Sequence, residues 1–122
     1  MATGRRVLVV EDDPTQLRWM AGVLEAQGYA VVAAADGDDA EMRAVVERPD
    51  CIVLDVVLPK VNGFQVCRHL THLPETHAIP VILVSVKDTP ADRQWGLQQG
   101  AALYLAKPFQ AEALVRGIRS AL

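Results

Sequence analysis

The sequence predicts an α/β fold in which helices cover both faces of a five-stranded parallel sheet. Five short runs rich in Val, Leu, Ile and Ala alternate along the chain with five segments of helical character. The runs are continuously apolar, as expected for strands that are buried on both faces. Crossovers between parallel strands are right-handed, which leaves few topologies. The runs cover residues 5–10, 29–34, 51–54, 81–84 and 102–106.

A helix start follows the first run. Asp13 precedes Pro14, and this pair combines a capping carboxylate with a proline at the first helical position. Apolar residues then recur at helical spacing as far as Leu24, and Gly28 ends the segment. We therefore expect a helix between the first two strands.

Each later run is also followed by a helical segment. The second helix opens at Asp36 or Gly37, and Pro49 ends that region. Pro90 starts the fourth helix and Gly100 stops it. These helices are expected over residues 37–46, 64–72, 90–99 and 110–120.

Composition indicates one domain with an aliphatic core. Hydrophobic residues make up 51% of the 122 residues and aromatic residues only 5%, and no linker, repeat or low-complexity segment interrupts them. We expect a single domain over residues 1–122. A net charge of −3 argues against binding of nucleic acid, which requires a cluster of basic residues.

The chain shows no targeting or membrane signal. No apolar run approaches the roughly 20 residues that cross a bilayer, and the N-terminus lacks the apolar stretch of a signal peptide. Cys51 and Cys67 lie far apart, so buried, reduced thiols are expected. These features predict a cytoplasmic protein without membrane insertion.

Reactive side chains stand where four of the five runs end. The first run ends at Asp12 and Asp13, the third at Asp55, the fourth at Ser85 and the fifth at Lys107. In open α/β sheets the binding crevice lies beyond the carboxyl ends of the strands. If the sheet has the doubly wound, flavodoxin-like order 2-1-3-4-5, these four ends are neighbours.

Such a cleft would gather three carboxylates, whose mutual repulsion a divalent cation and one lysine can cancel. The all-oxygen ligand set favours Mg²⁺ or a similar hard ion such as Mn²⁺. A carboxylate beside this ion can attack phosphorus and form an acyl phosphate. Asp13 has a competing role as a helix cap, which Asp12 does not have.

Several segments, spread over almost the whole chain, match one family pattern. They are residues 7–13, 49–55, 58–63, 80–85 and 100–109. Together they resemble the receiver domains of bacterial two-component response regulators. The resemblance implies a phosphoacceptor switch rather than an enzyme, with only intrinsic self-phosphorylation and self-dephosphorylation. It implies a sensor histidine kinase or a histidine phosphotransfer domain as donor, an unknown downstream protein as target, and a monomer or weak dimer.

The resemblance assigns the centre of the site. Asp55 would accept the phosphoryl group. Asp12, Asp13 and Asp55 would bind Mg²⁺ together with the backbone carbonyl of Val57. The Lys107–Pro108 peptide bond would be cis, as in typical receiver domains.

The resemblance also assigns a switch. Ser85 and Lys107 would contact the phosphoryl group, and Tyr104 would turn inward when Ser85 moves. The partner face would then include Trp95, Leu103 and Tyr104.

Some residues depart from the common family pattern, and others indicate a subgroup. Val86 stands where the family often has alanine, and Ala102 and Leu103 stand where many members carry acids. The output face is therefore less acidic than usual, which argues against binding to a flagellar motor. Some short segments resemble regulators of type IV pilus twitching systems, namely residues 62–65, 79–82, 87–88 with Asp92, 95–96 and 99–101.

Two other functions are open alternatives. A phosphorylation-independent interaction module would need only the folded surface. A phosphohydrolase with an aspartyl nucleophile would need an acid two residues after Asp55, where this chain has Val57. Trp19 is interpreted first as a packing residue and second as a docking contact, and His69 and His72 as a solvated surface pair rather than a metal site.

Overall fold

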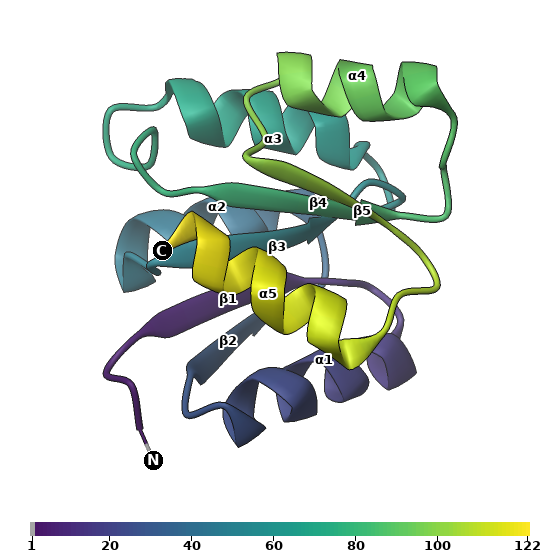
Figure 1. Ribbon diagram of the computed structural model, residues 1–122. Helices are drawn as coiled ribbons and strands as arrows, with labels where there is room; N and C mark the ends of the chain where they lie inside the picture. Colours follow the sequence, from purple (N-terminus) through teal and green to yellow (C-terminus); the bar gives the residue numbers. More distant parts are fainter. Residues whose placement is uncertain (1) are drawn as a thin grey trace.

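The computed structural model describes residues 2–122 and contains the predicted parallel sheet, with strand order β2-β1-β3-β4-β5 (Figure 1). All four strand pairs are parallel. The doubly wound, flavodoxin-like topology is thereby confirmed. The strands are β1 (Arg6–Val10), β2 (Ala30–Ala34), β3 (Cys51–Asp55), β4 (Val81–Ser85) and β5 (Leu103–Ala106).

Helices cover both faces of the sheet, as predicted. Figure 1 shows α1 and α5 on one face and α2, α3 and α4 on the other. Every helix lies within a few residues of the expected range, and within residues 2–122 each is too short or too polar to span a bilayer. The helices are α1 (Pro14–Ala26), α2 (Gly37–Glu47), α3 (Gly63–His72), α4 (Pro90–Gln98) and α5 (Ala111–Ala121).

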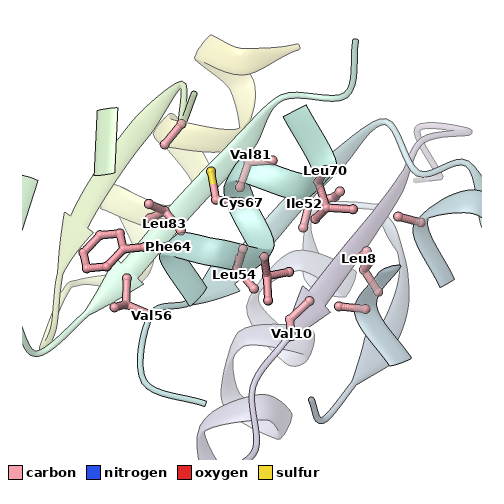
Figure 2. Packing of buried hydrophobic residues seen from close by; sticks show 14 of the residues in the cluster. Leu8, Val10, Ile52, Leu54, Val56, Phe64, Cys67, Leu70, Val81 and Leu83 are labelled. Carbon is pink, nitrogen blue, oxygen red and sulfur yellow. The ribbon is translucent and has the colours of Figure 1, made fainter. Parts of the chain in front are cut away.

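The central strand β3 explains why the runs are apolar without alternation. All five of its residues are buried. Ile52 and Leu54 point into the cluster beneath α2, α3 and α4, which Figure 2 shows, whereas Cys51 and Val53 point toward α1 and α5. A strand with a core on each face needs apolar side chains at every position.

Gly63 lets α3 begin directly against the end of β3. A Cβ atom built on Gly63 would lie 2.2 Å from the backbone oxygen of Asp55. The Gly63 N–H donates a 2.7 Å hydrogen bond to the carbonyl of Val56. This close approach fixes the backbone around Asp55, so glycine at this position belongs to the construction of the site.

Candidate functional site

The sheet register brings the predicted residues to one edge. Asp55, the last residue of β3, pairs with Val84 of β4. Ser85, the last residue of β4, pairs with Ala106 of β5, and Lys107 follows directly. Parallel strands end on the same side of a sheet, so Asp55, Ser85 and Lys107 meet at its carboxyl edge.

The Lys107 ammonium joins the two buried carboxylates of the site. Its Nζ donates to Asp55 Oδ2 at 2.7 Å and to Glu11 Oε1 at 2.6 Å, and it also donates to the side-chain oxygen of Gln16. The side chains of Glu11 and Asp55 are only 2% and 6% exposed. These bonds compensate two carboxylates that burial would otherwise destabilise.

Three carboxylates form a cluster that fits a divalent cation. One oxygen each from Glu11, Asp12 and Asp55 lies within 4.8 Å of the others, and Asp12 is exposed at the mouth. With Lys107 the group has a formal charge of −2, which one divalent ion would cancel. Carboxylate oxygens are ligands that Mg²⁺ prefers.

In the carboxylate cluster, Glu11 takes the part that the sequence analysis assigned to Asp13. The Asp13 carboxylate instead accepts from the N–H groups of Thr15 and Gln16, each at 3.4 Å, and so caps α1. It lies outside the three-carboxylate cluster, which includes the buried Glu11 that the analysis missed. The sequence does contain a signal for this assignment, because an aspartate directly before Pro14 is expected to cap the helix and is then not free to bind an ion. The residues available for an ion are then the two before it.

Val57 lies close to Asp55 and contacts its carboxylate. Its N–H donates a 2.9 Å hydrogen bond to Asp55 Oδ1, while its side chain is about half exposed. The bond holds the turn after β3 against the carboxylate. The role of the Val57 carbonyl as a metal ligand stays a prediction.

Burial and charge shift two pKa values in this cluster. Burial raises the pKa of Glu11 from 4.5 to about 7, although the hydrogen bond from Lys107 opposes that shift. Burial alone would lower the pKa of Lys107, but the hydrogen bonds and negative charges of Asp55 and Glu11 outweigh it and raise that pKa. The charged form of Lys107 is therefore favoured, whereas the charged form of Glu11 is only partly compensated for its burial.

Ser85 is connected to Tyr104 through one residue. The buried Ser85 hydroxyl oxygen accepts from the Lys87 N–H at 3.0 Å, and the Lys87 carbonyl accepts from the Tyr104 hydroxyl at 2.6 Å. The Tyr104 ring points inward, is 5% exposed and packs over Gly96. Burial is the main cause that raises the pKa of its hydroxyl.

The family model described as the response regulator receiver domain matches residues 7–119. The chain belongs to this family. It is therefore a phosphoacceptor domain of two-component signal transduction, a switch that interacts with histidine kinases or phosphotransfer proteins. Receiver domains bind Mg²⁺ in an acidic pocket.

Two curated relatives give the scale of the similarity. Protein PilH of Pseudomonas aeruginosa is 44% identical over 117 residues, which cover 96% of this chain and 97% of PilH. The alkaline phosphatase synthesis transcriptional regulatory protein SphR of Synechococcus elongatus is 42% identical, and this chain spans about half of it, 48%. The receiver domain thus resembles both a relative of its own length and a part of a longer regulator.

Solved receiver domains have the same fold. Chemotaxis response regulator CheY4 of Vibrio cholerae superimposes with a TM-score of 0.91 at 30% identity, covering 98% of this chain and all of CheY4. The receiver domain of sensor histidine kinase PA1611 from Pseudomonas aeruginosa gives 0.89 at 32% identity, covering 98% of each chain. That structure has a magnesium ion coordinated in the active-site cleft.

The predicted partner-face residues of this receiver domain point in different directions. Trp95 on α4 is 53% exposed, whereas Tyr104 is buried beneath that helix. Leu103 is half-buried and packs toward α5, against Gly117. Adjacent residues of β5 face opposite sides of the sheet, which separates Leu103 from Tyr104.

The remaining candidates also have clear surroundings. Trp19 is about half exposed and packs on Phe109, with ring centroids 5.7 Å apart. His69 pairs with Glu41 of α2 at 2.8 Å, and His72 bonds the backbone of its own helix. The Lys107–Pro108 bond is cis, as predicted.

Proposed function

We propose that Asp55 is the phosphoacceptor of this receiver domain, which we take to extend over residues 1–122. The observation that carries the proposal is the position of Asp55. It is a nearly buried carboxylate at the end of the central strand, held on one oxygen by Lys107 and on the other by the Val57 N–H. A fixed nucleophile beside a permanent cation is the arrangement that phosphoryl transfer requires.

Glu11, Asp12 and Asp55, with the Val57 carbonyl, would hold Mg²⁺ or Mn²⁺. The donor set supports this assignment, since it is all oxygen and its charge is left unbalanced by Lys107 alone. When bound, the ion would neutralise the oxygens of the phosphoryl group as charge shifts during transfer. Asp13 is not included, because its carboxylate caps α1.

In the proposed reaction an Asp55 oxygen attacks the phosphorus of a phosphohistidine on the donor. The new bond joins oxygen to phosphorus, and the phosphorus–nitrogen bond breaks with its electron pair returning to the imidazole. Lys107 contacts Asp55, and Ser85 ends the neighbouring strand β4, so both residues lie at the edge where the phosphoryl oxygens would arrive. They would donate to those oxygens and stabilise their charge.

Self-phosphorylation from small donors and self-dephosphorylation by water use the same atoms. In the second reaction a water oxygen attacks phosphorus and the Asp55 carboxylate leaves. Val57 has no acidic group to assist that step, and its side chain is about half exposed. We therefore expect slow hydrolysis of the aspartyl phosphate and no phosphohydrolase activity.

The signal would leave through a population shift. A phosphoryl group that draws the Ser85 hydroxyl toward itself withdraws the acceptor of the Lys87 N–H. The loop after β4 then rearranges. Tyr104, which is hydrogen-bonded to the Lys87 carbonyl in that loop, transmits the change to α4 and the exposed Trp95. The output is the binding of another protein to this face. The receiver domain would act in the cytoplasm as a monomer or weak dimer and would bind neither nucleic acid nor membrane.

The pathway follows from the subgroup. Similarity to PilH over nearly the full length of both chains supports the resemblance to regulators of type IV pilus twitching systems. We propose a motility pathway of that kind as the setting, with a chemotaxis-like kinase as donor.

Phosphotransfer from candidate histidine kinases of the same genome tests the proposal. The mass of the protein should rise by one phosphoryl group in the presence of Mg²⁺, and a peptide containing Asp55 should carry it. Asp55→Asn should stay unmodified. A wild-type protein that gains no phosphoryl group from any kinase or from acetyl phosphate, and whose partner affinity is unchanged in Asp55→Ala, would instead support a phosphorylation-independent interaction module.

A further inference from the structure

The first turn of α1 breaks its own sequence pattern. Asp13 is the helix cap and Gln16 is the third helical residue, a position from which a glutamine can bond back to the N–H of the cap. Here that N–H donates to Glu11 Oε2 at 3.2 Å. Glu11 therefore performs the local task, and the amide of Gln16 is available for another partner.

That partner is Lys107. The side-chain oxygen of Gln16 accepts a short hydrogen bond from Lys107 Nζ, whose other two protons go to Glu11 and Asp55. Gln16 is the neutral member of the three acceptors and is not one of the carboxylates that would bind a cation. An ion that takes oxygens from Glu11 and Asp55 would leave the bond to Gln16 intact.

The surroundings favour this bond. Gln16 and Lys107 lie at the edge of a cavity of about 420 Å³ whose other lining residues are apolar. Trp19 and Phe109 pack against each other in the same lining, one on α1 and the other two residues after Lys107. Gln16 is itself exposed, whereas the Lys107 side chain is only 12% exposed, so the charged donor is the shielded partner of this bond.

We propose that Gln16 is a positioning residue that tethers the Lys107 ammonium when a cation and a phosphoryl group occupy the site. The tether keeps the ammonium within reach of the phosphoryl oxygens after its carboxylate partners have been drawn to the ion. The inference rests on the proposed function, since it assigns a role to a residue that touches neither phosphorus nor the ion.

The chain supplies a matched control. Gln65 is also the third residue of its helix, after the capping residue Asn62, and is exposed. Its side chain makes no hydrogen bond within residues 2–122. Gln16→Leu and Gln65→Leu remove the same amide at equivalent helix positions, and only the first touches Lys107.

Trp19 fluorescence in a Trp95→Phe background would report two titrations, first Mg²⁺ alone and then beryllofluoride at saturating Mg²⁺. Gln16→Leu should bind beryllofluoride about three- to tenfold more weakly, the net effect of one typical hydrogen bond whose acceptor is exposed to water. Its affinity for Mg²⁺ should not fall, because the ammonium that competes for Glu11 and Asp55 is held less firmly. Gln65→Leu should match the parent in both titrations.

A double-mutant cycle with Lys107→Met tests the tether itself. With methionine at position 107, Gln16→Leu should change beryllofluoride affinity less than twofold. If binding without Lys107 is too weak to measure, the single variants that keep Lys107 provide the test. The ¹⁵N resonance of Lys107 Nζ should shift in Gln16→Leu but not in Gln65→Leu.

Equal weakening of both ligands by Gln16→Leu, an unchanged beryllofluoride affinity, or an unmoved Lys107 resonance would each overturn the inference. Failure of the proposed function has a different signature. The parent would then bind neither Mg²⁺ nor beryllofluoride, or Asp55→Asn would bind beryllofluoride as tightly as the parent.

Discussion

The Tyr104 hydroxyl donates a 2.6 Å hydrogen bond to the backbone carbonyl of Lys87, in the loop between β4 and α4. The same residue uses its N–H to bond Ser85. One peptide segment therefore connects the edge of the phosphoryl site with a ring buried under α4. We therefore expect a change at either end to alter the hydrogen bond at the other.

Tyr104→Phe removes the hydroxyl and leaves the ring in place over Gly96. The free energy of unfolding should fall by about 1 kcal/mol, the usual net value of one hydrogen bond. Amide hydrogen exchange in residues 86–89 should become faster, since Lys87 loses one of its two anchors. Denaturation in urea and exchange mass spectrometry would measure the two effects.

Tyr29→Phe is the matched control. Tyr29 is also buried, at 8% exposure, but packs on the face covered by α1 and α5, far from this loop. It should leave exchange in residues 86–89 unchanged. Equal exchange in Tyr104→Phe and wild type would show that the hydroxyl does not hold the loop.

The parallel sheet and its functional edge were predictable because they depend on local patterns. Continuous apolar runs such as Cys51–Asp55 identify strands with two buried faces, and a reactive residue at the end of each run needs only the strand order to be placed. Side-chain partnerships were less accessible. Asp13 and Glu11 have similar chemistry and lie two residues apart, and only the capping geometry separates the one that serves the helix from the one that enters the site.

Leu103 illustrates a second limit. The sequence places it beside Tyr104 on the last strand, which suggests a shared face. In the sheet, neighbouring residues alternate, so Leu103 packs toward α5 while Tyr104 packs under α4. The contacts of Gln16 were equally hidden, because its bond to Lys107 joins residues 91 positions apart.

Lys107→Met tests the charge balance of the cluster. Glu11 and Asp55 would keep their burial but lose their cation. In Mg²⁺-free buffer the free energy of unfolding should fall by about 2–3 kcal/mol, because unpaired buried charges are destabilising. Added Mg²⁺ should then stabilise the variant more than the wild type, since binding to the folded state alone raises stability.

Thermal unfolding with and without Mg²⁺ measures both effects. Lys60→Met is the control, because Lys60 is an exposed lysine in the loop after β3. It should change neither the stability nor the response to Mg²⁺ by more than about 0.5 kcal/mol. A Lys107→Met protein that matches the wild type with and without Mg²⁺ would mean that Lys107 does not balance the carboxylates.

Cys51 and Cys67 should be unreactive in the folded protein. Burial raises the pKa of each thiol from 9.0 to about 12. Only the thiolate is nucleophilic, so a disulfide reagent at pH 8 should label neither residue until urea unfolds the chain.

The pH dependence of stability follows from the same shift. A folded-state pKa above the unfolded value means that the thiols stabilise the fold fully below about pH 9 and lose this contribution as the pH rises toward 12. Cys51→Ala and Cys67→Ala should each flatten the stability profile in that alkaline range. Rapid labelling of the native protein at pH 8 would contradict the assigned burial.

Gly63→Ala tests whether the close approach of α3 to β3 builds the acceptor site. The new Cβ would lie 2.2 Å from the Asp55 backbone oxygen and 2.6 Å from Val56 Cα. Backbone atoms cannot rotate away as a side chain can, so either α3 or the end of β3 must move. The free energy of unfolding should fall by about 3 kcal/mol, at the upper end of overpacking effects.

Gly22→Ala on α1 gives the opposite sign. Gly22 is exposed in the middle of the helix, and a Cβ there meets nothing within 4 Å. Alanine should raise the free energy of unfolding by about 0.5–1 kcal/mol, because glycine is the poorer helix former.

Urea denaturation measures the free energy of unfolding of both variants, and reaction with acetyl phosphate measures their rates of phosphorylation. Gly63→Ala should slow phosphorylation strongly even where the protein is fully folded, while Gly22→Ala should not, because only the first substitution displaces the backbone that aims the Asp55 carboxylate. Equal phosphorylation rates in a folded Gly63→Ala protein would show that the position of Asp55 does not depend on this contact.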